Sequence, residues 1–401
     1  MTSGRAQLAT TGLQDVFLTG DPDLTYFEQV YKRHSKFSLE TLDNVFHNQD
    51  VDFGKTIRAT VERRGDLVRN IYFRIELPEL TAGVGYTDSI GNAMVEYADL
   101  IIGGQLIQRI NGEYMEFYDQ MFIDQSQQVG ITATVGTTGT RTGLGPAVSP
   151  VYPRTFFMNL PFYFRRNDSL SIPLCAITRQ EIEVEIKLRP LSELVVQTAP
   201  GVPPTQTASV LKATLPVEYV FLQDDEINYY KSKRIEHTIT QIQSQSDTIE
   251  KDTTDKQMRL NFINPVKEIF IVIQNQSNVA PDQNDLFNYQ NDLLTTQLDF
   301  NNEMYLDPEV ADSLFMYALQ AMNRHTRVPN RYIYNYSFAL DPENFRPTGQ
   351  VNMSRIQNKL LTLNVPTSSQ SREVRVYARS YNILRIENGL AGVLFIDNNT
   401  Y

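Results

Sequence analysis

Glu181-Ile-Glu-Val-Glu-Ile-Lys-Leu188 alternates charged and apolar residues without a break. A period of two predicts a β-strand with one face in a hydrophobic core and the other face in water. The same alternation recurs at Ile57–Val61 and at Ile71–Leu77. Val266–Ile273 is almost continuously apolar, which predicts a strand that is covered on both faces. Strands of these two kinds run through most of the chain, so we predict an all-β protein.

The chain has 401 residues, whereas a single hydrophobic core stops growing at roughly 250–300 residues. Each half carries about eight short predicted strands and little helix, and eight-stranded jelly rolls have this pattern. The pattern alone also fits other β-sandwiches. We predict two consecutive jelly-roll sandwiches with a few short helices. The predicted boundaries are an N-terminal arm at residues 1–22, a first domain at 23–222 and a second domain at 223–401.

Turn and helix signals separate the predicted strands. Gly103 and Gly104 lie between two apolar runs and predict a two-residue hairpin, and Asn111-Gly112 reads as a second turn. Asp224–Arg234 predicts a short helix that begins with acidic residues. A similar helix is expected after Asp23 or Thr25. Its predicted apolar face consists of Leu24, Phe27, Val30 and Tyr31.

The second half contains one more helix signal, at Asp307-Pro308-Glu309, where a cap, a proline and an acid follow one another. The predicted apolar face of this helix consists of Val310, Leu314, Ala318 and Met322. Two polar segments, residues 125–150 and residues 274–302, are expected to be long loops, and loops of this length are usually functional or mobile.

Composition and charge limit the function. The formal net charge is −11 and the sequence has no block of basic residues, so direct binding of nucleic acid is not expected. The single cysteine, Cys175, has apolar neighbours and is expected to be a buried structural thiol. No signal peptide is expected, and no apolar run reaches the ~20 residues that span a bilayer.

The sequence contains few motifs that would indicate an enzyme. Gly54-Lys55-Thr56 resembles the end of a phosphate-binding loop, but Gln49 stands where that loop needs a glycine. The histidines are scattered, without the clustering of a metal site. We therefore expect no catalytic residue, no cofactor and no metal. A carbohydrate-binding or carbohydrate-active jelly roll stays an alternative, because a pair of carboxylates ~5–10 Å apart cannot be read from a sequence.

Several segments, in order along the chain, resemble the major capsid proteins of nucleocytoplasmic large DNA viruses. They are Gln14-Asp-Val-Phe-Leu-Thr-Gly-Asp-Pro22, Gly103-Gly-Gln105, Leu160-Pro-Phe-Tyr-Phe-Arg-Arg-Asn167, Asn264-Pro-Val-Lys-Glu268, Asn352-Met-Ser-Arg355 and Val376-Tyr-Ala-Arg-Ser-Tyr-Asn-Ile-Leu-Arg-Ile-Glu-Asn-Gly-Leu-Ala-Gly392. The residues that carry the resemblance, called the family-signature residues below, are Gln14, Asp15, Leu18, Thr19, Gly20, Pro22, Phe27, Tyr31, Arg33, His34, Gly103, Gly104, Gln105, Gly112, Glu113, Pro161, Phe162, Pro265, Val266, Glu268, Asn352, Ser354, Arg355, Tyr381, Asn382, Arg385, Gly389 and Gly392.

The resemblance implies a structural, non-enzymatic protein with two fused jelly rolls per chain. It implies a homotrimer of pseudo-hexagonal outline that tiles an icosahedral shell around an internal membrane and a DNA genome. The expected place is the virion, after synthesis and assembly in the host cytoplasm. The expected partners are further copies of the chain and, through the N-terminal arm, minor capsid or penton proteins and membrane components. A minor capsid paralogue or a scaffold of the same fold stays an alternative.

Overall fold

The computed structural model describes residues 2–29, 31–47, 50–80, 84–137, 154–197, 207–279 and 283–395. The chain divides into two compact units, residues 1–36 and residues 37–401. The first unit contains two short helices, α1 (Ser3–Ala9) and α2 (Leu13–Thr19). All the strands of the described chain belong to the second unit.

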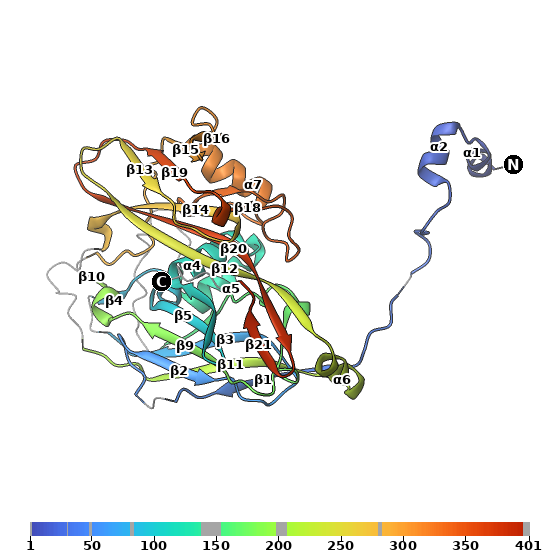
Figure 1. Ribbon diagram of the computed structural model, residues 1–401, viewed down its shortest axis with the longest axis horizontal. Coiled ribbons are helices and arrows are strands. Elements are labelled where there is room, and N and C mark those ends of the chain that lie inside the picture. The colour runs from blue at the N-terminus through green and yellow to red at the C-terminus, as the bar shows by residue number, and fades with distance from the viewer. Residues whose placement is uncertain are drawn as a thin grey trace. The chain divides into compact units, whose positions relative to one another are not determined.

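Two antiparallel four-stranded arrays form the first half of the second unit, in the lower part of Figure 1. One array has the order β1 (Ser38–Asn44), β11 (Lys212–Phe221), β3 (Leu67–Leu77) and β7 (Arg154–Asn159), and β8 (Ile172–Pro173) also pairs with β3. The other has the order β2 (Thr56–Thr60), β9 (Ile182–Leu188), β5 (Val95–Ile102) and β6 (Gln105–Asn111). A short pair consists of β4 (Val84–Tyr86) and β10 (Val195–Gln197).

The second half repeats this plan in the upper part of Figure 1. Its first array has the order β12 (Ile235–Ile249), β20 (Arg372–Glu387), β14 (Pro265–Asn275) and β17 (Tyr334–Ser337), with β18 (Val351–Asn352) on β14 and β21 (Leu390–Val393) on β20. Its second array has the order β13 (Asp255–Arg259), β19 (Lys359–Asn364), β15 (Thr295–Phe300) and β16 (Glu303–Leu306). The all-β prediction is confirmed, whereas a count of exactly eight strands per sandwich is not, because short strands extend the arrays.

The predicted strand patterns match the observed burial. In β9 buried and half-buried residues alternate, and Val184 and Ile186 have no exposed surface. Strand β14 is buried at every position between its two ends, as the continuous apolar run predicts. Gly103 and Gly104 form the β5–β6 hairpin turn at φ of 58° and 80°, in the left-handed region that glycine enters without cost.

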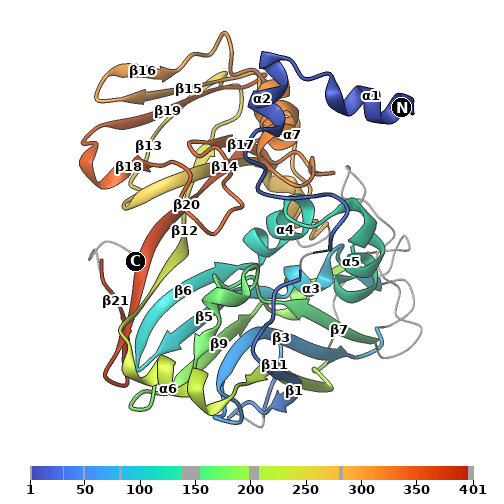
Figure 2. The same cartoon turned by 90° about the vertical axis from the view of Figure 1, so that its right-hand side faces the viewer.

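The two halves share one hydrophobic core. Strands β12 and β20 pair from Ile235 and Ile386 to Ile249 and Arg372, and Figure 2 shows both running from the second half down beside β6 of the first. Phe270 and Leu384 of the second half belong to the same buried cluster as the core of the first half. A second cluster lies within the second half alone. Continuous apolar packing of this kind favours one rigid body.

Short helices complete the second unit. The α-helices are α3 (Ile90–Ala93), α4 (Gly112–Met121), α5 (Gln128–Val135), α6 (Asp224–Ser232) and α7 (Gln320–Arg324). Single turns of 3₁₀-helix are η1 (Gln125–Gln127), η2 (Asp168–Leu170), η3 (Leu191–Glu193), η4 (Gln276–Val279) and η6 (Met353–Arg355), and η5 (Phe315–Leu319) is a π-helix that leads into α7. The predicted helix at Asp224–Arg234 is confirmed by α6.

The prediction of a packed helix at residues 23–31 is wrong. Residues 23–29 form turns, and the helices of the arm lie before them. Leu24, Phe27 and Tyr31 are exposed within the chain, and Val30 lies outside the described residues. Three- and four-residue spacing of apolar side chains stabilises a helix mainly by packing, and no described side chain of this segment is buried.

Two segments that were predicted as loops contain regular structure. Residues 125–135 form η1 and α5, in which Ile131 and Val135 are buried, and residues 138–150 lie outside the described residues. Residues 274–302 include the end of β14, η4 and strand β15. Their polar composition reflects half-exposed strand and helix faces rather than a lack of structure.

The predicted helix at Asp307 begins later than expected. Asp312 accepts a hydrogen bond from the backbone N–H of Phe315 at 2.7 Å and so caps the helix. Because the helix starts there and passes through the π-turn η5, its buried residues are Met316, Tyr317 and Ala321. Most of the face that was predicted to be buried is therefore exposed, as the side chains of Val310, Leu314 and Met322 show.

Candidate functional site

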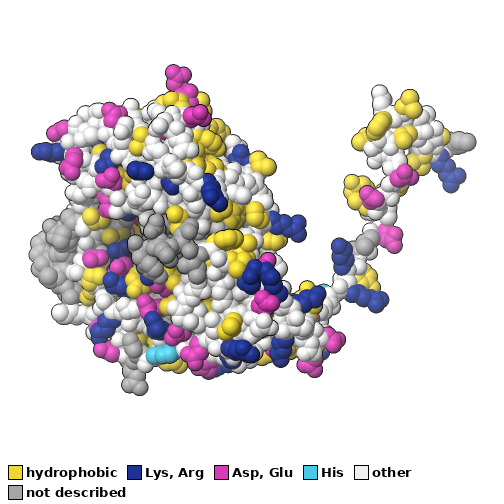
Figure 3. Space-filling view, in the orientation of Figure 1, with side chains coloured by type: hydrophobic (Ala, Val, Ile, Leu, Met, Phe, Trp, Pro, Cys, Tyr) yellow, Lys and Arg dark blue, Asp and Glu magenta, His cyan; other side chains and the backbone are white. Residues whose placement is uncertain are grey.

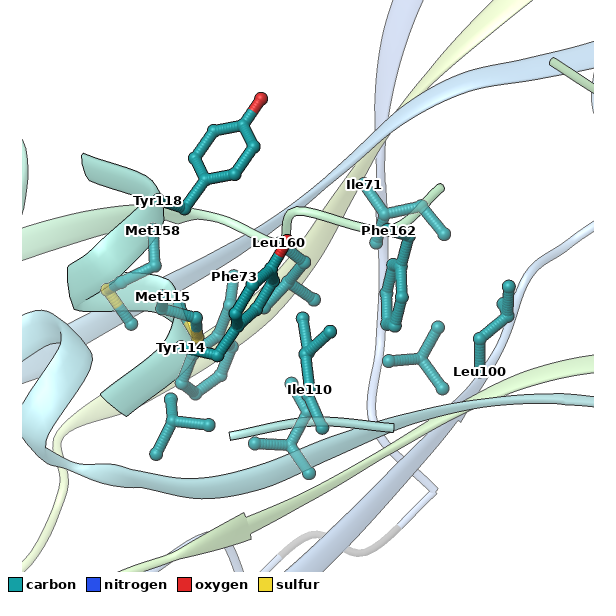
Figure 4. Packing of buried hydrophobic residues seen from close by; sticks show 14 of the residues in the cluster. Ile71, Phe73, Leu100, Ile110, Tyr114, Met115, Tyr118, Met158, Leu160 and Phe162 are labelled. Carbon is teal, nitrogen blue, oxygen red and sulfur yellow. The ribbon is translucent and has the colours of Figure 1, made fainter. Parts of the chain in front are cut away.

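Helix α4 lies between the two halves (Figure 2), and all of its residues are buried. Its apolar side chains include Tyr114, Met115 and Phe117, which belong to the shared core. Figure 4 shows Tyr114 and Met115 beside Phe73 and Leu160 of the first half. The prediction of a turn at Asn111-Gly112 is wrong, because Asn111 is the residue that precedes this helix.

The polar residues of α4 bind arginines of the second half. Glu113, Glu116 and Gln120 recur at a spacing of three and four, which places them on one helix face. Their partners come from β20 and from the segment that precedes β17. We call this set of contacts the ionic interface; it consists of Asp88, Glu113, Glu116, Gln120, Arg327, Arg331 and Arg375.

Arg331 is the most enclosed cation of the ionic interface, with a side chain that is 1% exposed. It donates to Glu116 Oε1 and to Asp88 Oδ2, each at 2.7 Å, and to the carbonyl oxygen of Phe287 at 2.8 Å. Burial alone would lower the pKa of Arg331, but the carboxylates of Glu116 and Asp88 raise it. The guanidinium therefore stays charged and ties the second half to α4 and to the segment before α3 of the first half.

Glu113 anchors strand β20 to the first turn of α4. Its carboxylate accepts hydrogen bonds from Arg375 Nε and Nη2 at 2.8 and 2.7 Å and from the Tyr289 hydroxyl at 2.8 Å, and the Tyr377 hydroxyl donates to it as well. Burial raises the pKa of Glu113, but Arg375 and the hydroxyls outweigh burial and lower it. A carboxylate in the first turn also stabilises the helix dipole.

Arg327 closes the other end of α4. It donates to the carbonyl oxygens of Gln120 and Asp119 at 2.7 and 2.9 Å, and its backbone N–H donates to the carbonyl of Met121 at 3.1 Å. The last carbonyls of a helix have no partner within the helix, and a cation there is favourable. The second half thus completes a helix that belongs to the first.

A second buried cluster joins the halves beside the ionic interface. Glu268 of β14 binds Arg379, and His325 Nε2 lies 3.1 Å from Glu268 Oε2. His325 Nδ1 lies 3.2 Å from Glu343, which also binds Arg166 of the first half at 2.9 Å. Burial alone would raise the pKa of Glu268, but Arg379 and His325 lower it to about 2.

This cluster predicts a pH dependence of stability. Burial alone would lower the pKa of His325, but Glu268 and Glu343 raise it above its usual value. Above pH ~6.5 the unfolded chain has lost this proton while the folded chain keeps it. The free energy of unfolding should therefore fall as pH rises from 6.5 through the folded pKa. We expect His325→Gln to flatten this slope between pH 6.5 and 8.5, measured by urea unfolding.

His237→Gln is the matched control for this measurement. Burial lowers the pKa of His237 to about 4, so above pH ~6.5 this residue is neutral in both the folded and the unfolded state. Its substitution should leave the slope above pH 6.5 as in the wild type. An unchanged slope in His325→Gln would show that His325 is not protonated in the folded chain.

The structure brings some family-signature residues together. Gly112 and Glu113 belong to α4, and Glu268 lies at the second cluster. The β5–β6 and β20–β21 hairpins meet, since Gln105 Oε1 accepts from the backbone N–H of Val393 at 3.3 Å and would lie 3.2 Å from a Cβ at Gly392. The carbonyl of Gly389 accepts from the N–H of Arg179 at 3.0 Å.

Other family-signature residues support single elements. Pro265 and Val266 pair with β18, and Ser354 Oγ accepts from the N–H of Asn264 at 2.8 Å. In η6, Asn352 accepts a hydrogen bond from the Ser354 N–H, and Arg355 is the last residue. Pro161 follows β7, and Phe162 lies in the core. On β20, Tyr381 contacts Lys267, Asn382 donates a hydrogen bond to Gln241, and Arg385 binds Glu236 at 3.0 Å.

The arm residues of the family signature do not join these contacts. Those described are exposed in the first unit, namely Gln14, Asp15, Leu18, Thr19, Gly20, Pro22, Phe27, Tyr31, Arg33 and His34. Asp15 caps α2 by accepting from the N–H of Gly12 at 2.7 Å.

The arginines of the ionic interface, Arg327, Arg331 and Arg375, were not predicted from the sequence. Tyr114, Phe117, Tyr118 and Met121 recur at helical spacing, and this pattern could have revealed α4. Within the described residues there is no group of three His, Cys, Asp or Glu side chains that could hold a metal ion. No helix in the same part of the chain is long and apolar enough to cross a membrane.

Two β-sandwiches that are fused through a shared core and buried ion pairs define a structural protein of the double jelly-roll class. Residues 25–223 match the family model described as "Major capsid protein N-terminus", and residues 226–392 match "Large eukaryotic DNA virus major capsid protein". The chain belongs to the major capsid protein family of nucleocytoplasmic large DNA viruses. It is a structural protein of the viral capsid, and its place is the virion shell.

Relatives and solved structures agree with this assignment. The chain is 28% identical to the major capsid protein of Pyramimonas orientalis virus and 27% identical to that of Phaeocystis pouchetii virus, over 98% of this chain and 100% of each relative. A chain of the PBCV-1 virus capsid has a TM-score of 0.80 at 22% identity, covering 93% of this chain and 100% of that one. The Faustovirus major capsid protein has a TM-score of 0.75 at 13% identity, covering 96% of each chain. These two likenesses show the fold.

Proposed function

We propose that three copies of this chain associate into a capsomer of pseudo-hexagonal outline that tiles the shell around an internal membrane. The observation that carries this proposal is the rigid connection between the two sandwiches, made by the shared core and the ionic interface. Three chains with two sandwiches each place six similar sandwiches around the capsomer, which gives the pseudo-hexagonal outline. A closed ring of three copies uses two different surfaces of each chain.

Exposed apolar side chains support an interface on the second half. Leu314 and Met322 on the η5–α7 helix are each 68% exposed. Leu340, which follows β17 in the sequence, is 73% exposed. Figure 3 shows hydrophobic side chains over this helix, whereas charged side chains of both signs are interspersed elsewhere on the face. Apolar patches of this kind mark association surfaces. The interspersed charges also support a protein that does not bind nucleic acid directly.

The oligomeric mass tests the capsomer proposal. Light scattering of the purified protein should give three times the 45.9 kDa of one chain. A stable trimer is expected because obligate interfaces bury about 2,000 Å² or more. A strict monomer under conditions of shell assembly would refute the proposal.

The first unit is suited to contacts with other components. Each described residue between 2 and 36 is exposed, including Phe17, which is 92% exposed, and Phe27, which is 98% exposed. Apolar side chains at such exposure favour a partner. We propose that the arm binds minor capsid or penton proteins and membrane components at the inner side of the shell.

Deletion of residues 1–20 tests this role of the arm. The truncated chain should still form the trimer, because these residues contribute no buried side chain to the described fold. Shell assembly, followed by electron microscopy, should be impaired. Failure of the truncated chain to trimerise would instead make the arm part of the capsomer.

The domain boundaries also stay a proposal: an arm at 1–22, a first jelly roll at 23–222 and a second at 223–401. The family models support the division near residue 223. The compact unit at residues 1–36 favours an arm that extends further than residue 22. We further propose that the chain has no catalytic role, since the buried charges of the ionic interface are engaged with one another.

A further inference from the structure

A cavity of about 200 Å³ lies where the two halves meet. Its walls come from α4 and the segment 161–170 of the first half, and from β12, β14, β20 and the segment 343–345 of the second half. Three cationic side chains line it: Arg166, Lys267 and Arg379. The carboxylate of Glu343 lines it as well.

Lys267 is the unusual residue of this cavity. It is 2% exposed, and the carboxylate of the adjacent Glu268 is bound by Arg379 rather than by this ammonium. Its Nζ lies 5.0 Å from the centre of the Tyr381 ring. Burial and the charge of Arg379 lower the pKa of Lys267 well below its usual value. Burial thus favours the neutral amine of Lys267, and an anion bound beside it would favour the charged ammonium instead.

The nearby carboxylates are already engaged. Glu268 binds Arg379 and lies against His325, and Glu343 binds Arg166, His325 and Thr326. Glu268 and Asp341 also attract Lys267, but burial and Arg379 outweigh them and lower its pKa. The carboxylates of Glu343 and Glu268 thus serve Arg166 and Arg379, and the ammonium form of Lys267 would gain from a further anion.

The cavity wall holds further donors. Arg166 uses Nη1 for Glu343 and is 35% exposed. The Tyr163 hydroxyl and Asn167 Nδ2 have no hydrogen-bond partner among the described residues. Arg and Lys side chains form short, charge-assisted hydrogen bonds with phosphate oxygens, and hydroxyl and amide donors of this kind complete such sites.

We propose that this cavity binds a small phosphate-type oxyanion, with Lys267 of the second half and Arg166 of the first half as its principal contacts. The anion favours the charged form of Lys267 and links the two sandwiches. Because it binds the folded chain and not the unfolded one, it stabilises the fold in proportion to its concentration.

The test uses the full-length protein at fixed pH and ionic strength, with sodium phosphate replacing sodium chloride in the low millimolar range. The melting temperature should rise with phosphate and saturate, and calorimetry should give one phosphate per chain. Lys267→Met should abolish both responses. Lys212→Met is the matched control, since Lys212 is exposed on β11 and this variant should respond as the wild type does.

Arg166→Met provides a second variant at a partly exposed position. Loss of one charge-assisted hydrogen bond should weaken phosphate binding about tenfold or more. A further titration with glycerol 3-phosphate separates two sources of the anion. Tighter binding of glycerol 3-phosphate would indicate a lipid headgroup, and tighter binding of inorganic phosphate would indicate the free anion.

Three results would overturn the proposal. One is a melting temperature and a calorimetric signal in the wild type that do not respond to either phosphate compound. Another is a phosphate response that persists in both Lys267→Met and Arg166→Met. The third is an equal loss of response in Lys212→Met, which would show a general effect of surface charge.

Discussion

Replacing Arg331 with methionine is expected to lower the free energy of unfolding by about 3–5 kcal/mol. The methionine leaves Glu116 and Asp88 buried without the cation that binds each of them at 2.7 Å. It also leaves the carbonyl oxygen of Phe287 without its donor. Urea unfolding of the purified protein measures this loss of stability. The substitution should also weaken the contact between the two halves and reduce the yield of trimer.

Arg385→Met is the matched control for Arg331→Met. Arg385 binds Glu236 at 3.0 Å, but the two side chains are 35% and 41% exposed. Exposed pairs contribute about 0–1 kcal/mol, so this variant should unfold almost as the wild type does. Equal losses in the two variants would show that burial does not set the contribution of Arg331.

The same difference in burial explains how much the sequence could predict. The strand pattern of β9 and the hairpin at Gly103-Gly104 depend on neighbours in the sequence, so alternation and turn chemistry were sufficient to predict them. Arg331 is 215 residues away from Glu116 in the chain. Only the folded topology brings these two charges together, and no local pattern contains that information.

The errors at the two helices have related causes. Asn111-Gly112 is a common turn sequence, and the reading of a turn hid helix α4, whose ends are completed by Glu113 and by Arg327 of the other half. At residues 23–31 the apolar spacing is helical, but helix stability depends on packing. Tertiary contacts thus created one helix that the local sequence obscured and left another without support.

At the candidate site, too, the sequence predicted some residues and not others. Resemblance identified Glu113, which lies in the ionic interface, and Glu268, which lies in the second buried cluster. Its last segment includes Arg379 but assigns no partner to it, and Arg375 lies just before that segment, where a charged residue on a strand is expected to face water. Their burial becomes apparent only when β20 is placed against α4.

Gly112→Ala is expected to cost at least about 4 kcal/mol, in the range where a single substitution prevents folding. A Cβ at this position would lie 2.2 Å from the carbonyl oxygen of Asn92 and 2.3 Å from that of Val95. Both atoms belong to the main chain, at α3 and β5, so no side-chain rotation relieves the overlap. Helix α4 would have to move away from the first half and would lose the register of its ionic contacts.

Gly130→Ala tests whether the effect at Gly112 is steric. Gly130 lies within α5, and a Cβ there would meet no atom within 4 Å. Alanine in a helix is favoured over glycine by about 0.5–1 kcal/mol, so this variant should be slightly more stable than the wild type. The two substitutions add the same methyl group within a helix, and opposite signs in urea unfolding would assign the loss at Gly112 to the close approach of α4 to α3 and β5. A mild effect at Gly112 would mean that α4 can shift without loss of the ionic interface.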